Sequence, residues 1–170
     1  SKGKDLLDQW IDLDPIFVGK QQSADYMMSI HKHLLESTKA ITLKGHWCEF
    51  GVRAGRSLNW LIDEYPEQVI HAFDSWQGLP EYWNHGTGKI ADMSCNPPVV
   101  PGHIQLHKGW FKDTVPTWKE NNKGPIAFLH MDADIYSSTK EVLTLLNDQI
   151  VPGTVITFDE FCNFRLSGKM

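Results

Sequence analysis

The sequence predicts an α/β fold in which helices cover both faces of a parallel sheet. Short apolar runs alternate with helical patterns along the chain, and most of the runs are bounded by Gly, Pro or Asp. Alternating strands and helices build parallel sheets of this kind. With 170 residues, 41% of them hydrophobic, the chain has the size and apolar content of one domain with its own core.

Five apolar runs are the expected strands. They are His46–Phe50, Val69–Phe73, Ile104–His107, Ile126–Met131 and Thr154–Phe158. Each run is too short for a typical helix, and the turn-forming residues around it are those that bound buried strands.

Helical spacing of apolar residues appears before the first run, after it, and after the fourth. The three groups are Met27, Ile30 and Leu34; Leu58, Leu61, Ile62 and Tyr65; and Val142, Leu143 and Leu146. A capping box of Ser138 with Glu141 is expected to begin the last of these helices. Trp118 lies in an expected short helix before the fourth strand. Glu81–Gly102 has no clear period and is expected to be a long functional loop.

Composition and charge exclude several classes of protein. A net charge of -5 argues against a nucleic-acid partner, because nucleic-acid binders carry a basic excess. No run approaches the roughly 18 apolar residues of a transmembrane helix, and Ser1–Asp14 has no signal-peptide pattern. Cys48, Cys95 and Cys162 are odd in number and widely spaced, which suits a reducing compartment. We therefore expect a cytoplasmic protein without membrane or nucleic-acid partners.

A glycine-containing loop follows the first expected strand. Gly51 and Gly55 lie within residues 49–57, where the backbone can turn tightly and approach a ligand ahead of a helix N-terminus. The spacing is Gly-x-x-x-Gly, whereas a dinucleotide pyrophosphate requires Gly-x-Gly-x-x-Gly. Asp74 lies 23 positions after Gly51, at the distance typical of an acid that binds ribose hydroxyls. S-adenosylmethionine is a nucleoside ligand without a diphosphate and has the required shape.

Four carboxylates follow the fourth and fifth strands: Asp132, Asp134, Asp159 and Glu160. If these strands are neighbours, their ends lie about 5 Å apart, and period 2 points Asp132 and Asp134 the same way while the chain stays extended. Crowded carboxylates need a compensating charge, and oxygen-rich sites suit Mg²⁺. The four acids can also divide the roles, with three as metal ligands and one as a base. For any single acid, a solvated strand end or helix start remains the alternative.

These motifs together resemble the macrocin O-methyltransferase (TylF-type) family of class I S-adenosylmethionine-dependent methyltransferases. The matching segments, in the order of the family, are EFGVRAGRS (49–57), AFDSWQGLPE (72–81), KGWFKDTVP (108–116), LHMDADIYSSTKEVL (129–143) and PGTVITFDE (152–160). The resemblance implies a Rossmann-like class I methyltransferase fold, and since that family continues through two further strands, we expect this sheet to lack the last two.

The resemblance also implies a Mg²⁺-dependent O-methyltransferase that moves a methyl group to a hydroxyl of a small molecule, with a sugar of a natural product as the candidate acceptor. The general base would be Asp134, and the metal ligands would be Asp132, Asp159 and Glu160. The expected cofactor-binding residues are Glu49, Gly51, Gly55, Ser57, Asp74, Ser75 and Trp110, the last because an aromatic after a strand on the cofactor side can line the adenine.

We expect one methyltransferase domain over residues 1–170. It comprises an N-terminal helical segment (1–44), a cofactor- and metal-binding core (45–160) and a short, truncated tail (161–170). Three alternatives stay open: an NAD(P)-dependent oxidoreductase, a metal-dependent hydrolase, and a non-catalytic S-adenosylmethionine- or nucleotide-binding module derived from a methyltransferase. The sequence also leaves open a homo-oligomer, because an uncovered sheet edge beyond the fifth strand favours pairing.

Overall fold

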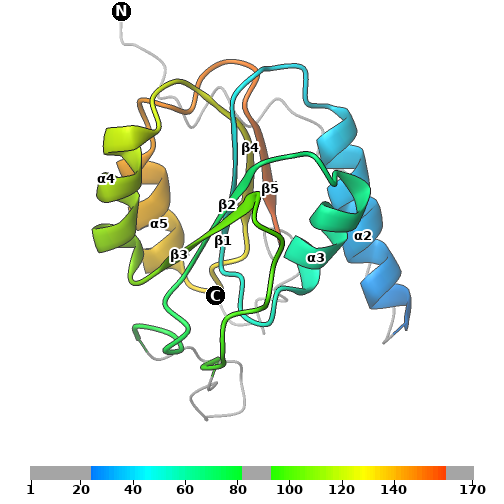
Figure 1. Cartoon of the computed structure of the whole chain (residues 1–170), viewed down its shortest axis with the longest axis horizontal. Helices are drawn as coiled ribbons and strands as arrows, with labels where there is room; N and C mark the ends of the chain where they lie inside the picture. The colour runs from blue at the N-terminus through cyan, green and yellow to red at the C-terminus, as the bar shows by residue number, and fades with distance from the viewer. Residues whose placement is uncertain (1–23, 82–92, 160–170) are drawn as a thin grey trace, which may run out of the picture.

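The computed structural model describes residues 24–81 and 93–159, and it confirms the parallel α/β sheet with helices on both faces (Figure 1). The strands are β1 (His46–Phe50), β2 (Ile70–Asp74), β3 (Ile104–Lys108), β4 (Ile126–Met131) and β5 (Val155–Phe158). Each expected strand is found within one residue at either end. Three parts of the expected organisation lie outside the described residues. They are residues 1–23 of the expected N-terminal segment, Glu160, and the expected tail (161–170).

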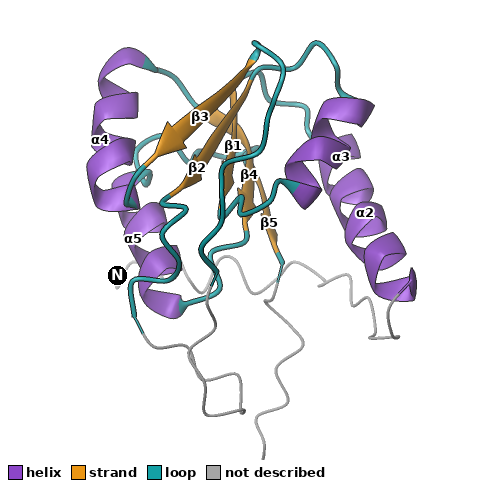
Figure 2. Ribbon diagram, turned by 60° about the horizontal axis from the view of Figure 1, so that its bottom comes forward, coloured by secondary structure: helices purple, strands orange, loops and turns teal. Residues whose placement is uncertain are grey.

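The strand order places a ligand crevice at one edge of the sheet. The order is β3-β2-β1-β4-β5 and all neighbouring strands are parallel, so all five strands end at the same edge (Figure 2). From β1 the chain moves outward to β2 and β3, and it then returns to place β4 on the other side of β1. In open parallel sheets, ligands bind at the carboxyl ends of the strands where the order reverses. Here that point lies between β1 and β4.

Four described helices cover the sheet in two pairs (Figure 1). On one face lie α2 (Ala24–Lys39) and α3 (Arg56–Glu64), and on the other lie α4 (Phe111–Asn121) and α5 (Tyr136–Leu145). The expected helices before β1, after β1, before β4 and after β4 are therefore all present. Among the described helices, none combines the length and the apolar character needed to cross a membrane.

Alternation along the strands gives each helix pair its own core. In β1, Trp47 packs with the core under α2 and α3, whereas Cys48 and Phe50 pack with the core under α4 and α5. Phe50 stacks on Phe73 of β2, with ring centroids 4.5 Å apart. Because the inner strands are buried on both faces, their sequences read as nearly continuous apolar runs.

The expected capping box at the start of the last helix is wrong. Helix α5 begins at Tyr136, and its N-cap residue, Ile135, makes no side-chain hydrogen bond. Ser138 is buried within the first turn of the helix instead. The N-cap lies three residues earlier than expected, at Ile135 and not at Ser138, because Asp134, at a φ of 58°, already turns the chain out of the strand direction. A Ser-x-x-Glu pattern alone does not fix where a helix begins.

Two histidines contact the ring of Trp118, a buried residue of α4, and a third histidine contacts one of them. The centroids of His71 and His46 each lie 5.2 Å from the Trp118 centroid. The Nδ1 atom of His71 lies 3.2 Å from Nε2 of His107. Burial, followed by the neighbouring His107 and His46, lowers the pKa of His71 to about 4. The His71 ring is therefore packed as a neutral side chain.

The buried imidazole of His71 predicts a loss of stability in acid. Its pKa is 6.5 in the unfolded chain and about 4 in the folded one, so the unfolded state takes up the proton first as the pH falls. The stability contribution is present above pH 6.5 and is lost towards pH 4, by up to about 3 kcal/mol. His71→Asn keeps a nitrogen near Nδ1 but cannot titrate, so its melting temperature should fall less than that of the wild type across this window. Parallel curves for the two proteins would contradict the prediction.

Candidate active site

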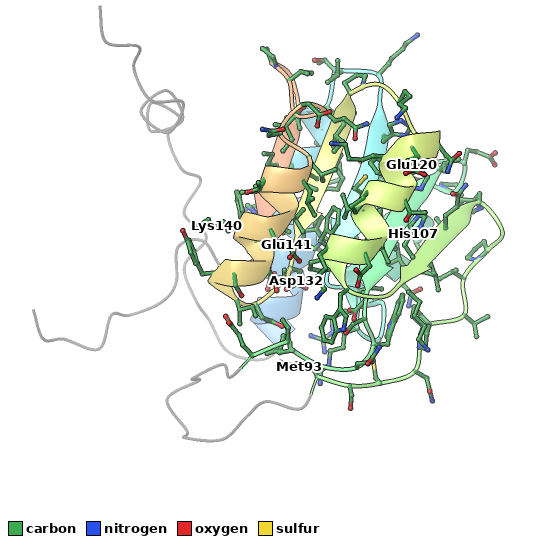
Figure 3. The ribbon with its side chains drawn as sticks, turned by 90° about the vertical axis from the view of Figure 1, so that its left-hand side faces the viewer. Met93, His107, Glu120, Asp132, Lys140 and Glu141 are labelled. Atoms are coloured by element: carbon green, nitrogen blue, oxygen red, sulfur yellow. The ribbon has the colours of Figure 1, made fainter. Side chains whose placement is uncertain are left out.

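A cavity of about 970 Å³ opens at the carboxyl edge of the sheet. It is lined by residues at or just past the ends of all five described strands: Gly51, Asp74, Gly109, Asp132 and Asp159. In Figure 3, Asp132, Glu141 and Met93, which all line the cavity, lie on this side of the molecule. Its volume is that of a site for a small ligand or cofactor.

The glycine loop after β1 forms one wall because its backbone touches the chain that follows β4. Gly51 has a φ of 87°, and a Cβ there would lie only 1.8 Å from the carbonyl oxygen of Asp132. Asp132 N–H in turn donates to Phe50 O at 2.8 Å. Gly55 has a φ of 79° and would place a Cβ 3.0 Å from Pro98. Neither position can carry a side chain without moving its neighbours.

Asp74 ties the glycine loop to the end of β2. One oxygen of its carboxylate accepts the N–H groups of Val52 and Arg53 at 2.8 and 2.7 Å. The other accepts the N–H of Trp76 at 2.7 Å. The structure therefore gives Asp74, which also lines the cavity, a loop-shaping task beside the expected contact with ribose.

Glu49 is fully buried and is not among the residues that line the cavity. Its Oε1 atom accepts a hydrogen bond from Ser57 Oγ and one from His130 Nδ1, the latter at 3.0 Å. Ser57 does line the cavity, so Glu49 lies one residue behind the wall. Burial alone would lower the pKa of His130, but the hydrogen bond and the charge of Glu49 outweigh it and raise that pKa.

The two other expected cofactor residues also line the cavity. Ser75 donates from its Oγ to Gly78 O at 3.1 Å and accepts the N–H of Gln77, so it shapes the loop after β2. Trp110 is the N-cap residue of α4 and lines the cavity from the end of β3. Trp76, by contrast, is buried in the core and donates its Nε1–H to Arg53 O.

Three of the four expected acids line the cavity together: Asp132, Asp134 and Asp159. Burial raises the pKa of Asp132 well above its usual range, and the nearby carboxylate of Asp159 raises it further against the effect of His130. The positive φ of Asp134 shows that the chain is not extended there, so the predicted reason for its direction is wrong. The turn still brings Asp134 to the cavity. The fourth acid, Glu160, is the one outside the described residues.

Sequence reasoning missed several residues around the cavity. Arg53, Arg56 and Lys112 add positive charge to its lining. His33 of α2 lies close to the acids: burial and then His130 lower its pKa, whereas Asp159 opposes the shift. The helical pattern gave no sign of this, because the packing of α2 beside β5 is a tertiary contact. Within residues 24–81 and 93–159, no group of three or more His, Cys, Asp or Glu side chains has metal-binding geometry.

With this geometry in place, comparison with known proteins identifies the family. A family model described as a methyltransferase domain matches residues 48–161, which include the glycine loop, Asp74 and all four acids. The chain belongs to this methyltransferase-domain family. Membership implies S-adenosylmethionine as the methyl donor, and it favours the methyltransferase interpretation over the oxidoreductase alternative.

Individual relatives of this methyltransferase domain include enzymes that are named O-methyltransferases. Mycinamicin III 3''-O-methyltransferase of Micromonospora griseorubida is 41% identical over an alignment of 157 positions that covers 77% of this chain and 61% of that protein. Demethyldecarbamoylnovobiocin O-methyltransferase of Streptomyces niveus is 25% identical over 114 positions, covering 56% of this chain and 42% of that protein.

A solved methyltransferase structure supports the same family assignment. The apo structure of CalS11, a TDP-rhamnose 3'-O-methyltransferase of calicheamicin biosynthesis, superposes with a TM-score of 0.60 at 25% identity. It covers 80% of this chain and 64% of the CalS11 chain. The methyltransferase domain described here thus spans about three fifths of the length of the mycinamicin relative and of CalS11.

The contact between Gly51 and Asp132 predicts a strong effect of one methyl group. Gly51→Ala should lower the free energy of unfolding by at least about 2 kcal/mol, because the new Cβ meets backbone and the φ is positive. Gly102→Ala is the matched control, since a Cβ there meets nothing within 4 Å. Its effect should stay within about 0.5 kcal/mol in denaturant titrations. Equal stabilities of the two variants would contradict the predicted contact.

Proposed function

We propose that this domain transfers the methyl group of S-adenosylmethionine to a hydroxyl of a sugar on a small molecule. The observation that carries the proposal is one cavity that joins a glycine loop to three carboxylates at the crevice between β1 and β4. Family membership supports methyl transfer, and the names of the relatives support a hydroxyl as acceptor.

The cofactor half is proposed to comprise the loop from Gly51 to Ser57, Asp74 and Trp110. The backbone of Asp132 occupies the space that a Cβ at Gly51 would fill, which holds the loop beside the acids, and the N–H groups at the start of α3 can face an anionic carboxylate. S-adenosylmethionine supplies an electrophilic methyl group on a sulfonium. The carboxylate of Asp74 is proposed to accept further hydrogen bonds from the ribose hydroxyls, and the Trp110 ring is proposed to offer an apolar surface to the adenine.

Mg²⁺ is proposed to be held by Asp132, Asp159 and Glu160. The described part of this donor set fits a hard cation, because both carboxylates line one cavity and the pKa of Asp132 is raised by burial and by Asp159. A raised carboxyl pKa of this kind is expected where buried negative charges lie together without enough positive charge nearby. When bound, the ion would lower the pKa of the acceptor hydroxyl.

Asp134 is proposed as the general base. It lines the cavity on the turn between β4 and α5, and its carboxylate lies close enough to act electrostatically on Asp132. In the reaction Asp134 would accept the hydroxyl proton while the acceptor oxygen attacks the methyl carbon, the methyl carbon–sulfur bond breaks, and the neutral thioether S-adenosylhomocysteine leaves. The cavity walls align the two reactants, which typically contributes about 7–11 kcal/mol to barrier reduction.

The first test is binding of S-adenosylmethionine by calorimetry, with and without Mg²⁺, followed by an assay of S-adenosylhomocysteine formation. We expect micromolar binding to the full chain. Mycinamicin III and TDP-rhamnose, the compounds in the names of two relatives, are the acceptors to assay, and they distinguish an acceptor without a nucleotide from a nucleotide-linked sugar. Absence of cofactor binding under both conditions would contradict the proposal.

Asp134→Asn tests the assignment of the base. Cofactor affinity should stay near the wild-type value, because the carboxamide preserves shape, whereas turnover should fall by about 10²–10⁴-fold. Asp63→Asn, an exposed acid on α3 outside the cavity, is the control and should leave both values unchanged. Wild-type turnover in Asp134→Asn would exclude Asp134 from this role.

A further inference from the structure

We propose that His130 is a positioning residue for the cofactor half of the site and acts through Glu49. Neither residue is among those that line the cavity. Together, however, they hold Ser57, which does line it. This inference rests on the proposed function, because it concerns how the same cavity holds S-adenosylmethionine.

The sheet register brings the two residues together. Glu49 of β1 is paired with His130 of β4, and His130 is paired with Thr157 of β5. The side chains of Glu49 and His130 are 0% and 1% exposed, and Nδ1 lies 3.0 Å from Oε1. A carboxylate buried this completely requires hydrogen-bond partners, because an unpaired buried charge costs several kcal/mol.

The direction of the hydrogen bonds follows from the chemistry of the groups. An ionised carboxylate only accepts, so both His130 Nδ1–H and Ser57 Oγ–H donate to Oε1. The single hydroxyl proton of Ser57 is thereby committed to the hydrogen bond with Glu49 and is not available to a ligand. The Ser57 oxygen is left to face the cavity as an acceptor, which suits a donor group on the ligand, such as the ammonium of an amino acid.

His130 supplies the second donor that keeps this arrangement in one orientation. The other carboxylate oxygen of Glu49, Oε2, is buried without a hydrogen-bond partner in the described part of the chain. With only the Ser57 donor left, the carboxylate could rotate about its terminal torsion and bring either oxygen to Ser57. Ser57 lies in the first turn of α3, so a loss of its orientation would loosen the wall that carries the glycine loop.

Two substitutions of His130 both remove the imidazole ring, but they place the replacing amide donor at different positions. The side-chain amide of Asn can take the place of Nδ1, whereas that of Gln reaches the place of Nε2. We expect His130→Asn to bind S-adenosylhomocysteine within about threefold of the wild type. His130→Gln should bind about tenfold more weakly, which corresponds to one lost charge-assisted hydrogen bond. Thermal melting of each variant confirms that it is folded.

Thr157→Val is the matched control. Thr157 shares the register position of His130 on the adjacent strand, is 2% exposed, and has a buried Oγ1 without a hydrogen-bond partner in the described residues. Its replacement removes a buried polar group at the same depth but no bond to Glu49. Cofactor affinity should therefore equal that of the wild type.

A second readout needs no cofactor. Heteronuclear NMR of the imidazole nitrogens of the wild-type chain should show Nδ1 of His130 protonated at neutral pH, and Glu49→Gln should weaken that signature. An unprotonated Nδ1, or equal affinities of the Asn and Gln variants beside a wild type that binds normally, would overturn the role of His130 alone. A wild type that binds no S-adenosylhomocysteine would overturn the proposed function and this inference with it.

Discussion

The close approach of the chain after β1 to the chain after β4 is the constraint on which the rest of the site depends. Gly51 lies so near the carbonyl of Asp132 that no side chain fits between them. This contact puts a loop suited to a nucleoside ligand directly beside a group of carboxylates. It exists because β1 and β4 are neighbours in the sheet although 80 residues separate the ends of the two strands (Phe50 and Met131 enclose residues 51–130).

Charge is the second organising feature of this edge of the sheet. A sulfonium cofactor and a divalent cation are both positive, and the acids around Asp132 provide the negative charge that both would compensate. Glu49 differs from the acids of the cavity in having two hydrogen-bond donors of its own, although its charge also raises the pKa of Asp132. On the proposed function, β4 contributes to both halves of the site, because His130 contacts Glu49 and Asp132 follows the end of the strand.

The fold was predictable because its signals are local. Short apolar runs between turn residues located every described strand within one residue, and helical spacing located most of the described helices. The make-up of the cavity was predictable where a residue ends a strand or directly follows one, as with Asp74 and Gly51, because the carboxyl ends of parallel strands meet at one edge. It was not predictable where the geometry is tertiary: the pairing of Glu49 with His130 depends on strand register, the turn at Asp134 depends on a positive φ, and the approach of His33 depends on how α2 packs.

The most direct measurement is a crystal structure of the full chain with S-adenosylhomocysteine and Mg²⁺. We expect the amino-acid end of the ligand over the loop from Gly51 to Ser57, the ribose at Asp74, and the ion on Asp132 and Asp159. A ligand bound away from the crevice between β1 and β4, or an ion that leaves both of these aspartates uncoordinated, would contradict the assignment of this cavity as a methyl-transfer site.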